Sequence, residues 1–239
     1  MSRCIPGLML RARILGDLSL TKGKIAVLTQ PLGKNYGGLI QAWALQQVLV
    51  RAGFEAIIVD RQACPRGKFF NFARYCARFL LRIQGKWRGP LNIEAYYDYF
   101  YANSNQFIRE NIKKTEPIFS NSELKVHFNN QEYNAVIVGS DQTWRPSYSP
   151  NIFNFFLDFV NDPQIKKISY ASSFGIDHWE FTEDQTKKCS SLAQEFNSIS
   201  VRERSGVQLC KDYLKVNAQF VLDPTLLLEK DYYFSLIKE

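Results

Sequence analysis

Cysteine and histidine are scarce in this chain of 239 residues, and they are spaced too far apart for several kinds of site. None of the five cysteines forms a CxxC pair; they are Cys4, Cys64, Cys76, Cys189 and Cys210. The two histidines are His127 and His178. This pattern disfavours a zinc ribbon, a redox motif and a disulfide framework. We therefore expect no bound metal, and free thiols in a reducing cytoplasm.

Long apolar runs are missing as well. Near the amino terminus, "GLMLRARILGDLSL" is interrupted by Arg11 and Arg13, so it is too short and too charged to span a membrane. It also lacks the unbroken apolar core and the small-residue cleavage site of a signal peptide. The sequence predicts that residues 1–23 form a flexible or loosely docked extension outside the fold.

Acidic residues are absent from one segment. Between Arg61 and Pro90 there are eight Lys or Arg and no Asp or Glu, whereas the whole chain has 30 basic and 23 acidic residues and a net charge of +7. Without this segment the chain is close to neutral. The basic surface is therefore expected to be a local patch.

The same segment has the pattern of an amphipathic helix. Arg74, Arg78 and Arg82 are four residues apart and share one helix face, while phenylalanines and leucines occupy another. One interpretation is a solvated helix face over the core. Another is contact with an anionic membrane surface through residues 69–88. No RNA- or DNA-binding motif accompanies the basic residues, so we expect no nucleic-acid partner.

Ordinary composition and alternating periodicity predict an α/β fold. Hydrophobic residues make up 46% of the chain and charged residues 22%, as in globular domains. Apolar, β-branched runs predict strands at Lys24–Thr29, Ala56–Asp60, Ala135–Gly139, Phe155–Phe159, Lys167–Ala171, Ser198–Val201 and Gln219–Leu222. Helical periodicity predicts helices at Leu39–Ala52, Phe70–Ile83, Glu94–Asn111, Ser122–Phe128, Thr182–Phe196, Arg204–Leu214 and Lys230–Ile237. We expect a Rossmann-like, mostly parallel sheet flanked by helices.

In such a sheet, ligands bind beyond the carboxyl ends of the strands. The first predicted strand is followed by "NYGGLIQAWALQ", in which Gly37 and Gly38 permit close backbone approach at the start of a helix. Asn35 and Tyr36 can donate hydrogen bonds to a hydroxylated or phosphorylated ligand. Free N–H groups at that helix end attract anions. A plain strand-to-helix turn is the alternative.

A second polar loop follows the strand in "VIVGSDQTW". This strand delivers Ser140, Asp141 and Gln142 to the edge of the sheet, where Asp141 and Gln142 can bind sugar hydroxyls. Trp144 can pack on the apolar face of a sugar. The alternatives are a capping or turn role for Asp141 and core packing for Trp144.

Three further loops lie at the same predicted edge. "SYASSFG" lacks the leading glycine of a nucleophile elbow, which disfavours a serine hydrolase and leaves Ser173 as a hydrogen-bond donor. In "ISVRERSG", Arg202 can bind a carboxylate or phosphate in a bidentate way, or form a structural pair with Glu203. In "VLDPTLLL", Asp223 is predicted to cap a turn.

Read in order, "NYGGLIQAWALQ", "VGSDQTW", "KKISYASSFG", "ISVRERSG" and "VLDPTLLL" resemble the polysaccharide pyruvyl transferase family. The resemblance covers residues 24–228. It implies the amino-terminal half of a two-domain fold of the glycosyltransferase-B kind, with residues 61–113 as a basic aromatic helical segment. Residues 229–239 would begin a second domain that is missing or truncated, which would leave the chain inactive, or dependent on a separate second-half chain or on a homo-oligomer.

The resemblance also implies a reaction. The family transfers a pyruvyl group from phosphoenolpyruvate to two hydroxyls of a saccharide, with no cofactor. It implies that Arg202 and Asp141 are catalytic, and that the other polar residues bind substrate: Asn35, Tyr36, Gly37, Gly38, Ser140, Gln142, Trp144 and Ser173. The acceptor would be a lipid-linked saccharide at the inner face of the cytoplasmic membrane. A nucleotide-sugar glycosyltransferase and a non-catalytic glycan-binding remnant are the alternatives.

Overall fold

The protein is described by a computed structural model that covers residues 22–33, 35–65 and 67–237. The extension expected at residues 1–23 therefore lies almost wholly outside the described residues. The described chain contains a six-stranded sheet in which every pairing is parallel. Its strands are β1 (Lys24–Leu28), β2 (Glu55–Val59), β3 (Ala135–Val138), β4 (Lys166–Ser172), β5 (Ser198–Val201) and β6 (Gln219–Phe220). The expected parallel α/β fold is confirmed.

The strand order is β2-β1-β3-β4-β5-β6. From β1 the chain first moves to β2 on one side, and later returns to the other side of β1 to form β3. The order of the strands thus reverses between β1 and β3, which places the topological switch point at their carboxyl ends.

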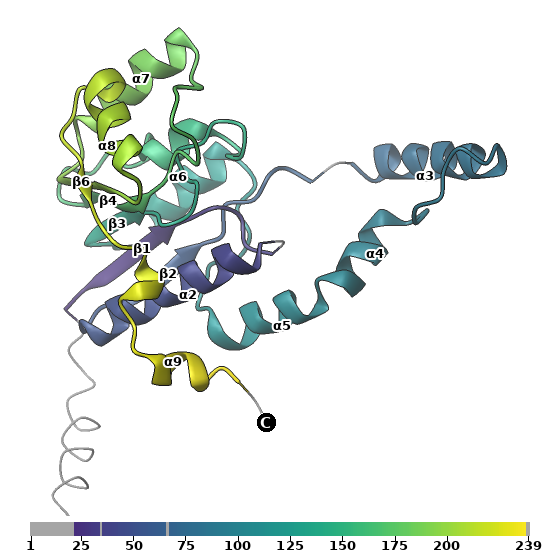
Figure 1. Ribbon diagram of the computed structural model, residues 1–239, viewed down its shortest axis with the longest axis horizontal. Coiled ribbons are helices and arrows are strands. Elements are labelled where there is room, and N and C mark those ends of the chain that lie inside the picture. Colours follow the sequence, from purple (N-terminus) through teal and green to yellow (C-terminus); the bar gives the residue numbers. More distant parts are fainter. Residues whose placement is uncertain (1–21, 34, 66, 238–239) are drawn as a thin grey trace, which may run out of the picture.

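Both faces of the sheet are buried, as its apolar strands predict. Alternate residues of β1 point to opposite faces: Ile25 and Val27 belong to one buried apolar cluster, and Ala26 and Leu28 to another. Helix α2 (Tyr36–Arg51) covers the first face with Leu39, Ala42, Trp43 and Leu45. Phe155 and Phe156 pack with Trp144 on the second face, where α6 (Asn121–Asn129), α7 (Glu183–Ala193) and α8 (Arg204–Leu209) also lie (Figure 1).

The predicted strand at Phe155–Phe159 is wrong. Residues Ile152–Phe156 form a short 3₁₀ helix, η1, capped by the Asn151 side chain, and Leu157 has a left-handed backbone with φ of 57°. Apolar side chains on every side of this segment enter the core, so its hydrophobic pattern does not distinguish a helix from a buried strand.

Two predicted helices are each divided into two elements in the structure. The segment Glu94–Asn111 is two helices, α4 (Ile93–Phe100) and α5 (Ala102–Asn111), joined at Tyr101. The predicted Arg204–Leu214 helix is α8 followed by one turn of π-helix, η2 (Cys210–Leu214). The last helix, α9 (Lys230–Phe234), packs on α2, where the rings of Tyr233 and Trp43 meet edge to face at 5.6 Å.

Helix α3 (Lys68–Ile83) and helix α4 form an arm that extends away from the sheet (Figure 1). Its base is fixed by buried Arg61, whose Nε donates to Oδ1 of Asn154 at 3.0 Å. Within the described ranges, no helix is long and apolar enough to cross a membrane.

Candidate functional site

A pocket of about 450 Å³ opens at the carboxyl ends of β1 and β3. Its wall comes from the segments after these two strands and from the first turn of α2, and it includes Gln30, Asn35, Gly38, Asp141, Gln142 and Tyr148. This is the topological switch point of the sheet, where ligands of open parallel sheets bind. The glycine-rich turn and the loop after β3 were predicted separately, and the fold brings them together here.

The carboxylate of Asp141 lies at the start of α2. Its Oδ1 accepts a hydrogen bond from the N–H of Gln142 at 2.7 Å, and its Oδ2 accepts one from Nδ2 of Asn35 at 3.4 Å. Asn35 is the N-cap residue of α2, but its side chain makes no capping hydrogen bond to the helix. Asp141 thus supplies negative charge at the positive end of α2, an interaction that the helix dipole favours.

Glycine is required on both sides of this contact. Gly38 is buried in the first turn of α2, and a Cβ built there would lie 2.6 Å from Oδ2 of Asp141. Gly139, which directly follows β3, has φ of +142°, and a Cβ there would lie 1.9 Å from the carbonyl oxygen of Tyr170. Gly139 therefore lets the loop after β3 pass close to β4, and Gly38 lets α2 begin against Asp141.

Three buried hydroxyls at this edge have no hydrogen-bond partner among the described residues: Thr29, Ser140 and Thr143. Thr29 follows β1, and the other two flank Asp141. Buried hydroxyls are nearly always paired in folded proteins, so a cluster of unpaired ones next to a pocket indicates a place where water or a ligand completes the hydrogen bonding.

The end of β4 is bent toward the same edge. Ala171 has a left-handed backbone with φ of 50°, and the register of β4 with β5 shifts between Ser169 and Ser172. A left-handed alanine costs about 1–2 kcal/mol. The bend lets the N–H of Ser173 donate to the backbone oxygen of Asp141 at 3.2 Å. The loops after β3 and β4 are therefore joined directly beneath the pocket.

Arg202 follows β5 and is held by three acceptors. Its Nη1 donates to the backbone oxygen of Ser140 at 3.3 Å and to Oδ2 of Asp223 at 3.1 Å, and its Nε donates to Oε1 of Glu203 at 3.1 Å. Burial lowers the pKa of Arg202, but the hydrogen bonds with both carboxylates outweigh it, so the pKa is raised overall. The structural Arg202–Glu203 pair that was an alternative for this motif is present.

The two carboxylates around Arg202 link the remaining parts of the edge. Glu203 Oε1 accepts a hydrogen bond from Oγ of Ser173 at 2.6 Å. Asp223 Oδ1 accepts from the N–H of Thr225 at 3.0 Å, which confirms the predicted turn cap, in the 3₁₀ helix η3 (Pro224–Leu226). The other oxygen of Asp223 also accepts from Gln41 of α2. Helix α2 therefore reaches both Asp141 and the Arg202 network.

Trp144 and Tyr36, both predicted to bind substrate, differ in accessibility. Trp144 is fully buried, its Nε1 donates to the backbone oxygen of Phe155 at 2.9 Å, and its ring stacks on Phe156 at 4.9 Å. In this structure it offers no face to a sugar and packs beneath the loop. Tyr36 is 55% exposed at the outer rim.

Several polar residues of this edge were missed by sequence reasoning. Gln41, Glu203 and Asp223 were not singled out as site residues, although they surround Arg202. Tyr148 lines the pocket, and the guanidinium of nearby Arg145 is 4.5 Å from the Tyr148 ring and pairs with Glu180 at 3.2 Å. The hydrogen bond with Glu180 is the main cause of the raised pKa of Arg145. The sequence signal that could have identified Arg145 is its position in "SDQTWRP", directly after a predicted strand.

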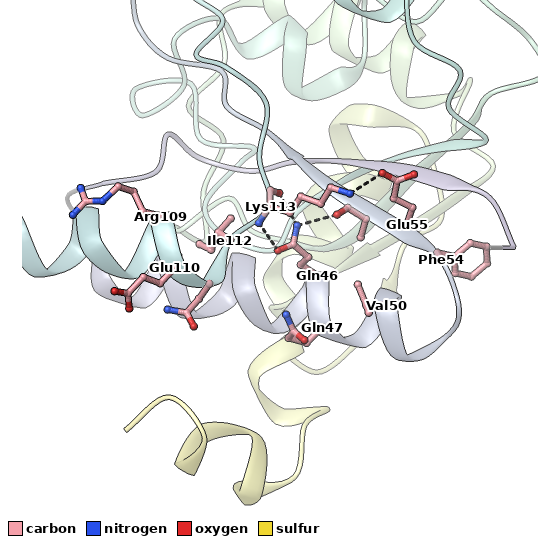
Figure 2. A pocket seen from close by; sticks show the side chains of 11 residues that line it. Gln46, Gln47, Val50, Phe54, Glu55, Arg109, Glu110, Ile112 and Lys113 are labelled. Atoms are coloured by element: carbon pink, nitrogen blue, oxygen red, sulfur yellow. Dashed lines mark hydrogen bonds and ion pairs between the residues drawn. The ribbon is translucent and has the colours of Figure 1, made fainter. Parts of the chain in front are cut away.

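A second pocket, of about 510 Å³, lies between α2, α5 and the start of β2 (Figure 2). Glu55 is the first residue of β2, so this pocket is at the amino end of the sheet. Three of its polar residues are paired: Gln46 bonds the backbone of Ala56 and Lys113, and Lys113 Nζ lies 2.8 Å from Glu55. The hydrogen bond from Lys113 lowers the pKa of Glu55. These contacts hold α2 and the segment after α5 against β2, so we interpret this pocket as structural.

Acidic, cysteine and histidine side chains do not gather into a potential metal site anywhere in the part of the chain that the structure describes. Among the described residues, the groups around Asp141 and Arg202 are hydroxyls, amides, a guanidinium and carboxylates. Such a set suits a polar, hydroxylated or anionic ligand held by hydrogen bonds.

The fold and this edge define a parallel α/β protein with a polar pocket at its switch point. The family model of the polysaccharide pyruvyl transferases matches residues 35–239, and the chain belongs to that family. A comparison with curated proteins gave no match.

Proposed function

We propose that this protein transfers the pyruvyl group of phosphoenolpyruvate to two hydroxyls of a saccharide. The acceptor would belong to a capsular polysaccharide, an exopolysaccharide or a cell-wall glycan. The observation that carries the proposal is the joining of Asp141 and Arg202 at one sheet edge, through Ser140, in a chain of this family. An acidic group and a cation in adjoining positions are what the reaction requires.

The reaction converts an enol phosphate into a cyclic ketal. The methylene carbon of phosphoenolpyruvate gains a proton, one sugar hydroxyl adds to the adjacent carbon, and a second hydroxyl adds as phosphate leaves. Of the two hydroxyl protons released, one balances the new methyl group and the other leaves with phosphate. The protein must therefore hold an anion and move protons.

In this proposal the Asp141 carboxylate accepts a proton from the attacking sugar hydroxyl. Its Oδ1 is fixed by the N–H of Gln142, while Oδ2 accepts a hydrogen bond from the Asn35 side chain. The longer Asn35 contact of 3.4 Å can give way to a hydroxyl donor. Asn35, Gln142 and the backbone of Gly37 and Gly38 would hold the remaining sugar oxygens.

Arg202 would hold the carboxylate or phosphate of the donor. It is about a quarter exposed, and Glu203 and Asp223 already neutralise it. The donor anion must therefore displace at least one of these carboxylates from the guanidinium. Ser173, which bonds Glu203 at 2.6 Å, and the unpaired hydroxyl of Ser140 lie next to it and can take up the freed hydrogen bonds.

We further propose that this sheet is the amino-terminal half of a two-domain enzyme of the glycosyltransferase-B kind. Residues 24–228 would form that half, and residues 229–239 would lead into the second. The exposed rim, with Tyr36 and Tyr148, then faces a partner domain across the cleft. A lipid-linked acceptor would hold the protein at the inner face of the cytoplasmic membrane.

The test is to incubate the full chain with phosphoenolpyruvate and a panel of lipid-linked saccharides, and to measure phosphate release and the mass of the acceptor. The proposal expects both to depend on phosphoenolpyruvate, and Asp141→Ala and Arg202→Ala to abolish them. Asp212→Ala and Arg109→Ala, away from this edge, are matched controls. Turnover of a nucleotide sugar instead would identify a glycosyltransferase. Glycan binding without turnover of any donor would identify a binding protein.

A further inference from the structure

Helix α3 exposes its apolar face and turns its polar face inward. Phe69, Phe72 and Ile83 are 86%, 65% and 70% exposed, and Phe79 and Leu80 are exposed beside them. Asn71, Arg74 and Arg78 are only half-exposed, and Arg78 donates to the backbone oxygen of Leu91 at 3.1 Å. A helix that covers a protein core has the opposite orientation. This apolar face is therefore arranged for contact with something outside the arm.

The arm is also strongly basic around this face. Six Lys or Arg and no Asp or Glu lie between Lys68 and Pro90. Arg82, Lys86 and Arg88 are exposed at the carboxyl end of α3 and in the turn that follows it. Trp87 is half-buried in the same turn, and Nε1 of its indole donates to the backbone oxygen of Pro90 at 3.3 Å. An exposed apolar face accompanied by exposed basic residues is typical of a helix that lies in a membrane interface.

The projection of the arm makes such contact geometrically possible. Figure 1 shows α3 at the far end of the arm, away from the sheet and from the pocket at its carboxyl edge. The helix has 16 residues, so its apolar face is about 24 Å long. Arg61 at the base is buried and bonded to Asn154, so the arm starts from a fixed point on the domain. Helix α3 can reach a surface while the domain stays in water.

We propose that the α3 arm docks this protein on an anionic lipid surface, with the apolar face of α3 inserted among the headgroups. Charge favours this occupant over a second copy of the chain. Packing two α3 faces in parallel would bring the exposed basic ends of both copies together, and this repulsion opposes a dimer of that kind. A negatively charged bilayer instead attracts each exposed Lys or Arg and accepts the aromatic side chains.

The experiment is flotation of the full chain with vesicles of phosphatidylcholine, with and without phosphatidylglycerol. It needs neither donor nor acceptor, so its result is independent of the proposed reaction. We expect binding only to vesicles that contain phosphatidylglycerol, and weaker binding as salt is raised. The double substitution Arg82→Gln and Lys86→Gln should weaken binding by about fivefold for each charge. Lys125→Gln with Lys211→Gln, both exposed elsewhere, should leave it unchanged.

The apolar face is tested in the same way. Phe72→Ser with Ile83→Ser should weaken vesicle binding by about tenfold or more, because both side chains leave water on docking. The matched control is Val50→Ser with Val126→Ser, which are 49% and 56% exposed on α2 and α6. All four side chains are exposed, so circular dichroism and thermal unfolding should show that every variant folds as the parent does.

Several results would overturn the proposal. One is the absence of vesicle binding by the parent chain. Another is equal binding to neutral and anionic vesicles, or equal losses in the arm variants and their controls. If the Phe72→Ser and Ile83→Ser variant dissociates a dimer in analytical ultracentrifugation while no vesicle is bound, the occupant is a second copy. If the arm binds a single-stranded oligonucleotide but no vesicle, the basic surface serves nucleic acid.

Discussion

Gly38 lies so close to Asp141 that any Cβ at position 38 requires the Asp141 side chain or α2 to shift. The two residues are separated by more than one hundred positions in the chain, yet a Cβ on Gly38 would lie 2.6 Å from Oδ2 of Asp141. The glycine-rich turn is therefore shaped by a carboxylate of the protein itself. The sequence predicted that the amino-terminal end of α2 attracts a ligand anion. In the structure the Asp141 carboxylate already lies at that end, so a ligand that binds there contacts Asp141.

Gly38→Ala should displace either α2 or the Asp141 side chain. Without a clash, alanine in place of glycine in a helix would stabilise the protein by up to about 1 kcal/mol. A decrease in the free energy of unfolding would therefore indicate the clash with Asp141. We expect Gly38→Ala to lower both the free energy of unfolding and phosphate release from phosphoenolpyruvate. Urea denaturation and the phosphate assay measure the two effects. Gly67→Ala, where a Cβ meets nothing within 4 Å, is the control.

A double-mutant cycle shows whether Asp141 is the cause. In an Asp141→Ala background the clashing oxygen is gone, so Gly38→Ala should become neutral or stabilising. We expect a coupling free energy of about 0.5–3 kcal/mol, the range for residues in contact. Additive effects of the two substitutions would show that position 38 requires glycine for another reason.

Glu203→Gln should make Arg202 a better anion site. Glu203 and Asp223 both pair with Arg202, so removing one negative charge leaves more of the guanidinium's attraction for an incoming anion. We expect phosphoenolpyruvate to bind several-fold more tightly in isothermal titration calorimetry, with stability lowered by about 1 kcal/mol from the lost charged hydrogen bonds.

The control for this prediction is Glu123→Gln, at the start of α6 and away from the carboxyl edge. It should leave phosphoenolpyruvate affinity unchanged. If Glu203→Gln weakens binding instead, Glu203 holds Arg202 in its binding position rather than competing with the ligand. That outcome would reverse the role assigned to the carboxylate.

The sequence predicted the sheet well because several of its strands are short apolar runs rich in β-branched residues, as in "AVIV" at Ala135–Val138. It failed at Phe155–Phe159, where a 3₁₀ turn buries the same kinds of side chain. The loops of the site could be located from the strand ends. Their contacts could not, because Gln41 and Asp223 meet across 182 positions of the chain. The residues next to Asp223 in the sequence do not indicate that its Oδ2 pairs with Arg202.

Trp144→Phe separates the core role of this side chain from the sugar-binding role that its motif suggested. The indole is fully buried and bonds the backbone oxygen of Phe155, so the substitution leaves that oxygen without its partner. We expect a loss of about 1–3 kcal/mol in the free energy of unfolding. Saccharide affinity, measured by calorimetry on the folded variant, should stay unchanged. Trp87→Phe, on the arm, is the control for loss of an indole. A loss of saccharide affinity in Trp144→Phe but not in Trp87→Phe would show that Trp144 contributes to sugar binding.

His127 should make the fold sensitive to mild acid. Burial, and to a lesser degree the Lys24 ammonium, lower the pKa of His127, whose Nε2 lies 3.0 Å from the Tyr133 hydroxyl. In the unfolded chain its pKa returns to about 6.5. Below that value the unfolded state binds a proton that the folded state resists, so the stabilisation is complete above about pH 6.5 and is lost as pH falls through the folded pKa.

Urea denaturation between pH 8 and pH 5, roughly spanning this range, should show a smaller loss of stability in His127→Gln than in the parent. His178→Gln is the matched control, because His178 is 70% exposed. Equal pH dependence in the parent and His127→Gln would show that the acid sensitivity comes from other groups.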